Sequence, residues 1–137
     1  MHYREWPRWQ GLSGKVPYVG THEAKPHVTL RYAETLRRQV WDEYPYNKRT
    51  GATDWDPLTK SYPADPTGVC CHKAEWLRQR LGGTVLYGRR TDKPNAGMHA
   101  VLWLKHGDFG FIVDEDGIWP ERSAPFACDA THKAYQR

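Results

Sequence analysis

Apolar residues recur at helical spacing in two stretches of the chain. The first stretch has its stripe at positions i, i+4, i+7 and i+11: Thr29, Ala33, Leu36 and Val40. This spacing places all four side chains on one face, so the pattern predicts an amphipathic helix over residues 28–44. Pro45 ends the stretch, because proline lacks the backbone N–H that a helix interior needs.

The second stretch predicts a helix over residues 70–81, which the pair Gly82–Gly83 closes. Its apolar stripe has the same spacing: Cys70, Ala74, Leu77 and Leu81. Residues 45–68, between the two helices, contain four prolines and two glycines. We therefore expect a long irregular connection there, and connections of that length are often functional.

After Gly83 the pattern changes to one typical of β-strands. Three stretches are rich in β-branched and aromatic residues: 84–89, 98–105 and 109–114. Helices that precede a run of strands favour an α+β fold with an antiparallel sheet. We predict a single domain over residues 1–137, with a loop-rich lead-in at 1–27, a core at 28–119 and an irregular tail at 120–137.

Composition and charge argue against a membrane-spanning, secreted or nucleic-acid-binding protein. No run of 18 apolar residues occurs, so no membrane span is expected. The first residues, MHYREWPRWQ, lack the apolar core of a secretory signal, which predicts a cytoplasmic protein. The net charge is +4, but the basic residues are spread along the chain and form no stripe with the aromatic residues, which argues against nucleic-acid binding.

The chain has three cysteines, and two of them, Cys70 and Cys71, are adjacent. A bond between neighbouring cysteines closes a strained ring, so no disulfide framework is expected. Metal-ligand spacings such as C-x-x-C are missing, so we expect neither a metal site nor a cofactor. Helix phase places Cys70 on the apolar face and Cys71 on the polar face with Glu75.

Cys70 also falls in the first turn of its predicted helix, where unpaired backbone N–H groups and the helix dipole favour a thiolate. Two interpretations stay open from the helix alone. The thiol is either a nucleophile or a small buried hydrophobic group, which is common for free cysteine.

A hairpin is predicted between the last two strands, with His106–Gly107 as its two-residue turn. In that register His99 lies directly opposite Asp114. A carboxylate beside an imidazole can fix its tautomer and stabilise the imidazolium. The pair is either the base and orienting group of a cysteine nucleophile or an ordinary polar pair at the end of a sheet.

Several short motifs resemble the bacterial transglutaminase-like cysteine proteinases. They occur in this order along the chain: V-W-D-E-Y-P-Y at 40–46, D-W-D-P at 54–57, G-V-C-C-H-K-A-E-W-L at 68–77, H-A-V-L-W-L at 99–104 and F-I-V-D at 111–114. The resemblance implies a papain-like core with Cys70 as nucleophile, His99 as base and Asp114 as orienting group. It also suggests that Trp55 lines the site or donates its indole N–H to the oxyanion.

The chain departs from this family beside the nucleophile. Where the family has acidic residues, this sequence has Val69, Cys71 and His72, which puts the calcium dependence of some members in doubt. Relatives that act on surface adhesins are exported, whereas this chain begins without a signal. Small stand-alone relatives also occur in phage genomes, and a compact chain acting inside a host cell would fit that setting.

The sequence therefore predicts a cysteine peptidase or amidase that acts on a protein or peptide through Cys70, His99 and Asp114. Three alternatives stay open. The same triad could transfer the acyl group to an amine or deamidate glutamine, the substrate could be peptidoglycan, or the chain could be a binding or inhibitor module that keeps the fold without turnover. The oligomeric state is also left open by the sequence.

Overall fold

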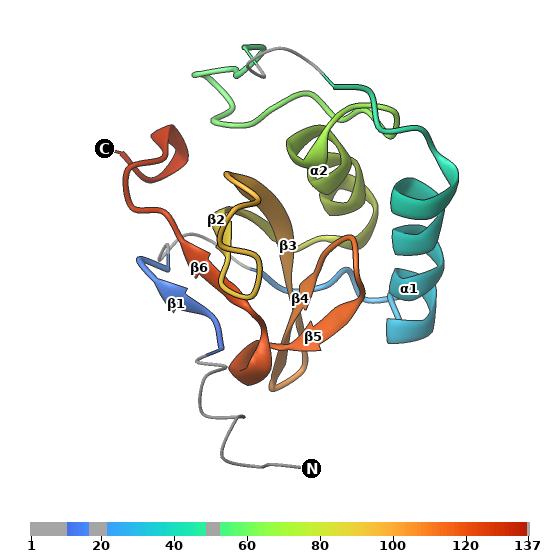
Figure 1. Cartoon of the computed structure of the whole chain (residues 1–137). Coiled ribbons are helices and arrows are strands. Elements are labelled where there is room, and N and C mark those ends of the chain that lie inside the picture. Colours follow the sequence, from blue (N-terminus) through green and yellow to red (C-terminus); the bar gives the residue numbers. More distant parts are fainter. Residues whose placement is uncertain (1–10, 17–21, 49–52, 137) are drawn as a thin grey trace.

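In the computed structural model, two helices cover one face of a six-stranded sheet (Figure 1). The structure describes residues 11–16, 22–48 and 53–136. The part of the predicted lead-in at 1–10 and 17–21 lies outside the described residues. Mixed α and β structure of this kind agrees with the predicted α+β class, whereas the finer papain-like core stays a prediction.

The helices occur where the apolar stripes predict them. The first, α1, spans Leu30–Arg38 and continues as a π-helical turn, η2, over Gln39–Glu43. Thr29 caps α1 by accepting the N–H of Tyr32 at 3.1 Å. The second, α2, spans Cys70–Leu81 and ends at Gly82, which has a φ of 86° that glycine adopts without strain.

Three antiparallel strands form the centre of the sheet: β2 (Thr84–Arg90), β3 (His99–His106) and β4 (Phe109–Val113). Three shorter strands extend it: β1 (Ser13–Gly14), β5 (Ile118–Pro120) and β6 (Phe126–Cys128). The strand order is β1-β6-β2-β3-β4-β5, and only the β1–β6 pair among these is parallel.

The prediction of an irregular tail at 120–137 is wrong for Phe126–Cys128, which pairs with β2. The strand at Ile118–Pro120, which pairs with β4 at the predicted boundary between core and tail, was also not predicted. Strands of three residues are too short to show a two-residue period in sequence. Their pairing depends instead on contacts far away in the chain, such as the full burial of Phe126 against Leu86 and Val101.

The predicted hairpin exists, but its register differs from the prediction. Lys105 pairs with Gly110 and His106 with Phe109, so Gly107–Asp108 forms the turn. Gly107 has a φ of 63°, which suits glycine at the first central position of a tight turn. Every partner is therefore two residues further along β4 than predicted, so His99 does not lie directly opposite Asp114.

The two faces of the sheet bury different clusters. On one face α1 and α2 pack against the sheet: Leu36, Val40, Leu77, Leu81, Leu102, Leu104 and Val113 lie in this cluster. The other face carries a second cluster: Leu86, Val101, Trp103, Ile112, Ala124 and Phe126. Alternation along β4 thus turns Val113 toward the helices and Ile112 away from them.

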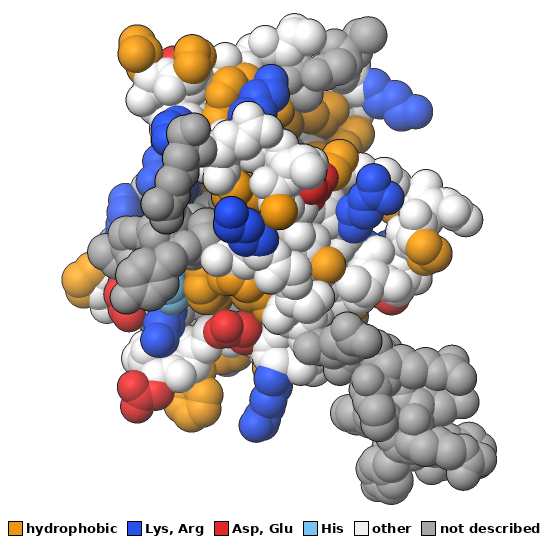
Figure 2. All heavy atoms as spheres, turned by 90° about the vertical axis from the view of Figure 1, so that its left-hand side faces the viewer, with side chains coloured by type: hydrophobic (Ala, Val, Ile, Leu, Met, Phe, Trp, Pro, Cys, Tyr) orange, Lys and Arg blue, Asp and Glu red, His pale blue; other side chains and the backbone are white. Residues whose placement is uncertain are grey.

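Lys and Arg side chains are dispersed among hydrophobic and uncharged atoms on the face that includes the C-terminal end (Figure 2). No helix among the described residues is long and apolar enough to cross a membrane.

Candidate functional site

The site is built around the first turn of α2. Cys70 is the first residue of this helix, and its side chain is partly exposed. Backbone N–H groups in a first turn have no partner within the helix, and their dipoles favour a negative charge. The position of Cys70 therefore agrees with the position predicted from sequence.

The burial of the two sulfurs is the reverse of the prediction. Cys71 is 5% exposed and packs with Tyr62 and Tyr87, whereas Cys70 is the more accessible residue. The prediction that Cys71 faces away from the core is wrong, because the connection that leads to α2 folds over the polar side of the helix. Tyr62, which lies in that connection, is itself only 7% exposed.

The Cys70 thiol interacts with the thiol of Cys71, with His99 and with the backbone N–H of Ala100. The contact with Cys71 and then the contacts with His99 lower the pKa of Cys70 to about 4, although burial opposes them. Burial lowers the pKa of His99, but hydrogen bonds to Cys70 and Glu115 outweigh it and raise that pKa to about 9. The site therefore favours a thiolate–imidazolium pair.

Glu115 is the carboxylate that contacts the histidine. Its Oε2 forms an ion pair with Nε2 of His99. Burial raises the pKa of Glu115, but the hydrogen bond and charge of His99 outweigh burial and hold that pKa below its usual value. Glu115 is thus ionised and oriented toward the imidazole.

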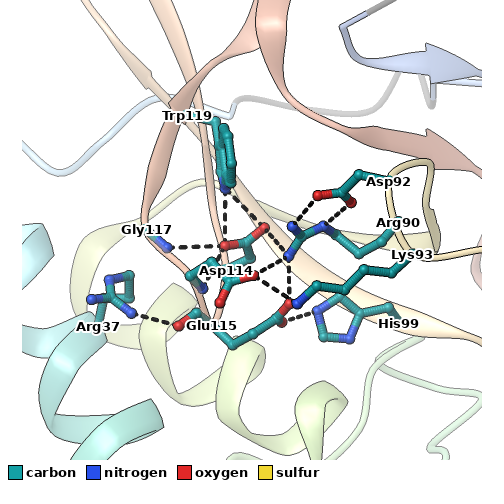
Figure 3. A network of polar contacts seen from close by, with 10 residues as sticks. Arg37, Arg90, Asp92, Lys93, His99, Asp114, Glu115, Gly117 and Trp119 are labelled. Atoms are coloured by element: carbon teal, nitrogen blue, oxygen red, sulfur yellow. Dashed lines mark hydrogen bonds and ion pairs between the residues drawn. The ribbon is translucent and has the colours of Figure 1, made fainter. Parts of the chain in front are cut away.

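Asp114, the predicted orienting group, binds elsewhere. Both of its carboxylate oxygens accept from the indole Nε1–H of Trp119 at 3.0 Å. One oxygen also accepts the backbone N–H of Asp116 at 2.8 Å. Figure 3 shows the Glu115 side chain reaching His99 while Asp114 meets Trp119 and Arg90.

The pairing of His99 with Asp114 is therefore corrected to His99 with Glu115. The two carboxylates lie beyond the end of β4 at Val113. Asp114 is held in the turn there, because its Oδ1 accepts the backbone N–H groups of Asp116 and of Gly117 at 2.8 and 3.1 Å, whereas Glu115 extends to His99.

Arg90, the last residue of β2, is buried behind this carboxylate. It is 3% exposed, and its Nη1 donates to Oε1 of Glu115 at 2.5 Å and to Oδ2 of Asp114 at 3.2 Å. Its other nitrogens form a two-point contact with Asp92 at 2.7 and 2.8 Å. Arg37 of α1 also donates to the backbone carbonyl of Glu115, at 2.8 Å. Two arginines therefore fix the side chain and the backbone of Glu115.

His72 is held in a second buried pair beside the nucleophile. Its Nε2 lies 2.8 Å from Oδ2 of Asp54, and its Nδ1 accepts the backbone N–H of Val69 at 3.2 Å. Because Nδ1 accepts, Nε2 carries the proton and donates to the carboxylate. This arrangement caps α2 one residue before Cys70. A side chain at Gly68 would meet the His72 ring, since a Cβ there would lie 2.5 Å from the Cβ of His72.

Trp55 lies in an aromatic cluster rather than beside His99. Its ring meets Tyr62 edge-on with centroids 5.0 Å apart, and it contacts Tyr87 and His132 in the same way. The role of Trp55 in oxyanion binding stays a prediction. The tryptophan next to His99 is Trp41, whose ring centroid is 6.0 Å from the imidazole.

A cavity of about 830 Å³ lies on the flank of α2. Its walls come from the connection before α2, from α2 itself, from β2 and from the C-terminal end: they include Asp54, Tyr62, Glu75, Arg78, Tyr87 and Tyr135. Cys70 is not among the lining residues. Within the described residues, no group of three His, Cys, Asp or Glu side chains is arranged to hold a metal ion.

Sequence reasoning missed three site residues: Glu115, Arg90 and Tyr46. Glu115 lies one residue beyond a predicted strand end, where the alternation of a strand no longer places side chains. Arg90 carries no local signal, because its partners Asp114 and Glu115 lie 24 and 25 residues away along the chain. The hydroxyl of Tyr46 interacts with the backbone N–H and the thiol of Cys70. Tyr46 was part of a motif at the end of the first helix, but nothing in its spacing indicated this contact.

A scan against protein-family models, a search of curated proteins and a search of solved structures each find no match to this chain. The likeness to transglutaminase-like cysteine proteinases therefore stays a prediction from short motifs. Any function assigned to this chain rests on its own residues and their geometry.

Proposed function

We propose that this protein is a cysteine-dependent hydrolase that cleaves an amide bond in a protein or peptide. One observation carries the proposal: Cys70, which is partly exposed, begins a helix and interacts with His99, and Nε2 of His99 is paired with Glu115. A nucleophile, a base and an orienting carboxylate in this order are the groups that thiol hydrolases need. The α+β fold with a cysteine helix against a sheet is compatible with a papain-like core.

The reaction proceeds in two stages through these groups. In the first stage the Cys70 thiolate attacks the amide carbonyl carbon, and the carbonyl π electrons move to oxygen. The C–N bond then breaks as the His99 imidazolium gives its proton to the leaving amine, and a thioester remains on Cys70. In the second stage neutral His99 takes a proton from water, the resulting hydroxide attacks the thioester, and the acid is released with the thiolate restored.

Glu115 acts on His99 rather than on the substrate. Its charge favours the imidazolium needed in the first stage, and Arg90 keeps the carboxylate from rotating away. Asp114 supports the turn that carries Glu115, through its bonds to Trp119 and to the backbone N–H of Asp116.

The test is cleavage of a complex peptide mixture, with new termini read by mass spectrometry. We expect the wild-type protein to generate new termini and the Cys70→Ala variant to generate none. Cys128→Ala is the matched control, because Cys128 is buried against β2 and its pKa is raised to about 11 by burial. Cleavage that persists in Cys70→Ala, or no cleavage by the wild-type protein, would contradict the proposal.

A further inference from the structure

We propose that the hydroxyl of Tyr46 is a catalytic group that donates a hydrogen bond to the oxyanion formed when Cys70 attacks a carbonyl. This inference rests on the proposed function, because it assigns a second residue to the same reaction. Its partner donor is the backbone N–H of Cys70.

Backbone contacts on both sides of Tyr46 hold it against the start of α2. The carbonyl of Pro45 accepts from Nζ of Lys73 at 3.0 Å, and Lys73 lies on α2 one turn after Cys70. The N–H of Asn47 donates to the carbonyl of Thr67 at 3.2 Å, three residues before Cys70. The chain at 45–47 therefore runs alongside the segment that carries the nucleophile.

The ring of Tyr46 belongs to the same aromatic group as the histidine. It stacks on Trp41 with centroids 6.1 Å apart, and Trp41 lies 6.0 Å from the ring of His99. The Tyr46 side chain is accessible, since the residue is 51% exposed. A bound substrate can therefore reach Tyr46, which a group that stabilises a transition state requires.

The hydroxyl of Tyr46 interacts with both the backbone N–H and the thiol of Cys70. The hydroxyl of Tyr46 is therefore within hydrogen-bond reach of the same N–H that would bind the oxyanion. Partial burial and then the charge of Cys70 raise the pKa of Tyr46 to about 12, so the phenol keeps its proton near neutral pH. A carbonyl oxygen bound to the Cys70 N–H thus lies beside the protonated hydroxyl of Tyr46, which can donate to it.

Two reagents separate oxyanion stabilisation from the reactivity of the thiolate. With p-nitrophenyl acetate, the thiolate attacks the ester carbonyl, an oxyanion forms, and p-nitrophenolate leaves as the acetyl thioester remains on Cys70. With iodoacetamide, the thiolate displaces iodide at a saturated carbon, and no oxyanion forms. Both rates are proportional to the fraction of Cys70 present as thiolate. The ratio of the acylation rate to the alkylation rate, measured at one pH, is therefore unaffected by a change in that fraction.

The experiment measures this ratio in Tyr46→Phe, which removes only the hydroxyl. Mass spectrometry assigns both modifications to Cys70, and Cys70→Ala supplies the background rate. We expect the ratio to fall roughly 10- to 100-fold, since one oxyanion donor is typically worth about that much or more. Tyr44→Phe is the matched control, because the Tyr44 ring packs on Trp76, 6.3 Å between centroids, and we expect its ratio to be unchanged.

The outcomes distinguish this inference from the proposed function. A ratio in Tyr46→Phe equal to that of the wild-type protein would overturn the role of Tyr46 while the fast alkylation of Cys70 still supported a nucleophile. An equal fall in Tyr44→Phe would also overturn it. Slow alkylation of Cys70 in the wild-type protein would instead remove the nucleophile, and the role of Tyr46 with it.

Discussion

Glu115 pairs with Nε2 of His99 through one carboxylate oxygen, while its other oxygen accepts from Arg90 at 2.5 Å. The Glu115 carboxylate thus binds both the imidazole of His99, which can gain or lose a proton, and the guanidinium of Arg90, which stays charged. The neighbouring residue Asp114 binds Arg90 and Trp119 instead. Within the described residues, the carboxylate that forms an ion pair with His99 is that of Glu115 and not that of Asp114. Two adjacent carboxylates therefore have different tasks.

Replacing Glu115 by Gln should lower the pKa of His99. Burial lowers this pKa, and the hydrogen bond to Cys70, followed by the hydrogen bond and charge of Glu115, raises it to about 9. Removal of the Glu115 charge therefore makes the imidazolium less stable. We expect a fall of at least about one pH unit, measured by NMR titration of the His99 ring protons. Asp114→Asn is the control and should shift this pKa less. A larger shift in Asp114→Asn than in Glu115→Gln would restore Asp114 as the orienting group.

Alkylation of Cys70 should be nearly independent of pH between about 4 and about 9, the two pKa values of Cys70 and His99. The thiolate is already formed over this range, so raising the pH adds little of the reactive species. Cys128 supplies an internal comparison, because burial raises its pKa to about 11. Its alkylation should rise about tenfold per pH unit over the same range. Parallel profiles for the two cysteines, measured by peptide mass spectrometry with iodoacetamide, would contradict a thiolate at Cys70.

The sequence predicted the elements of the site better than it predicted its contacts. The stripes that begin at Thr29 and Cys70 place both helices, because helix periodicity is a local property of the chain. The burial of Cys71 could not be predicted in this way. It depends on the connection before α2, whose path over the helix is set by long-range contacts such as those of Lys73.

The hairpin shows a different limit of sequence reasoning. Gly107 marks the turn in either register, and the two registers differ by two residues, which leaves every side chain on the same face of its own strand. Hydrophobic alternation therefore could not choose between them. The choice of carboxylate is made after the strand, where Asp114 binds backbone N–H groups of the turn and Glu115 pairs with His99.

Replacing Asp54 by Ala should destabilise the start of α2. The change leaves the protonated Nε2 of His72 buried without its acceptor at 2.8 Å, and His72 is fully buried. An unsatisfied buried donor costs about 1–3 kcal/mol. We expect Asp54→Ala to lower the free energy of unfolding by that amount, measured by urea denaturation, and Asp54→Asn to recover most of it, because the amide oxygen can still accept. Equal losses in the two variants would show that the bond to His72 is not the cause.

Among the lysines of the described residues, Lys73 should be the one whose substitution lowers the free energy of unfolding most. Its side chain is fully buried, and its Nζ donates to the carbonyls of Val40 at 2.6 Å, Pro45 at 3.0 Å and Pro66 at 2.5 Å. Lys73→Met keeps the apolar stem but leaves three carbonyls without this donor, so we expect a loss of at least about 2 kcal/mol in the free energy of unfolding.

Lys48→Met is the matched control for this variant, because Lys48 is exposed in the connection that Lys73 anchors. Its free energy of unfolding should stay within about 0.5 kcal/mol of the wild-type value. The carbonyl contacts also hold the chain beside Cys70, so Lys73→Met should slow acylation of Cys70 by p-nitrophenyl acetate even at temperatures where the variant is folded. Wild-type stability and acylation in Lys73→Met would show that these three contacts do not hold the connection in place.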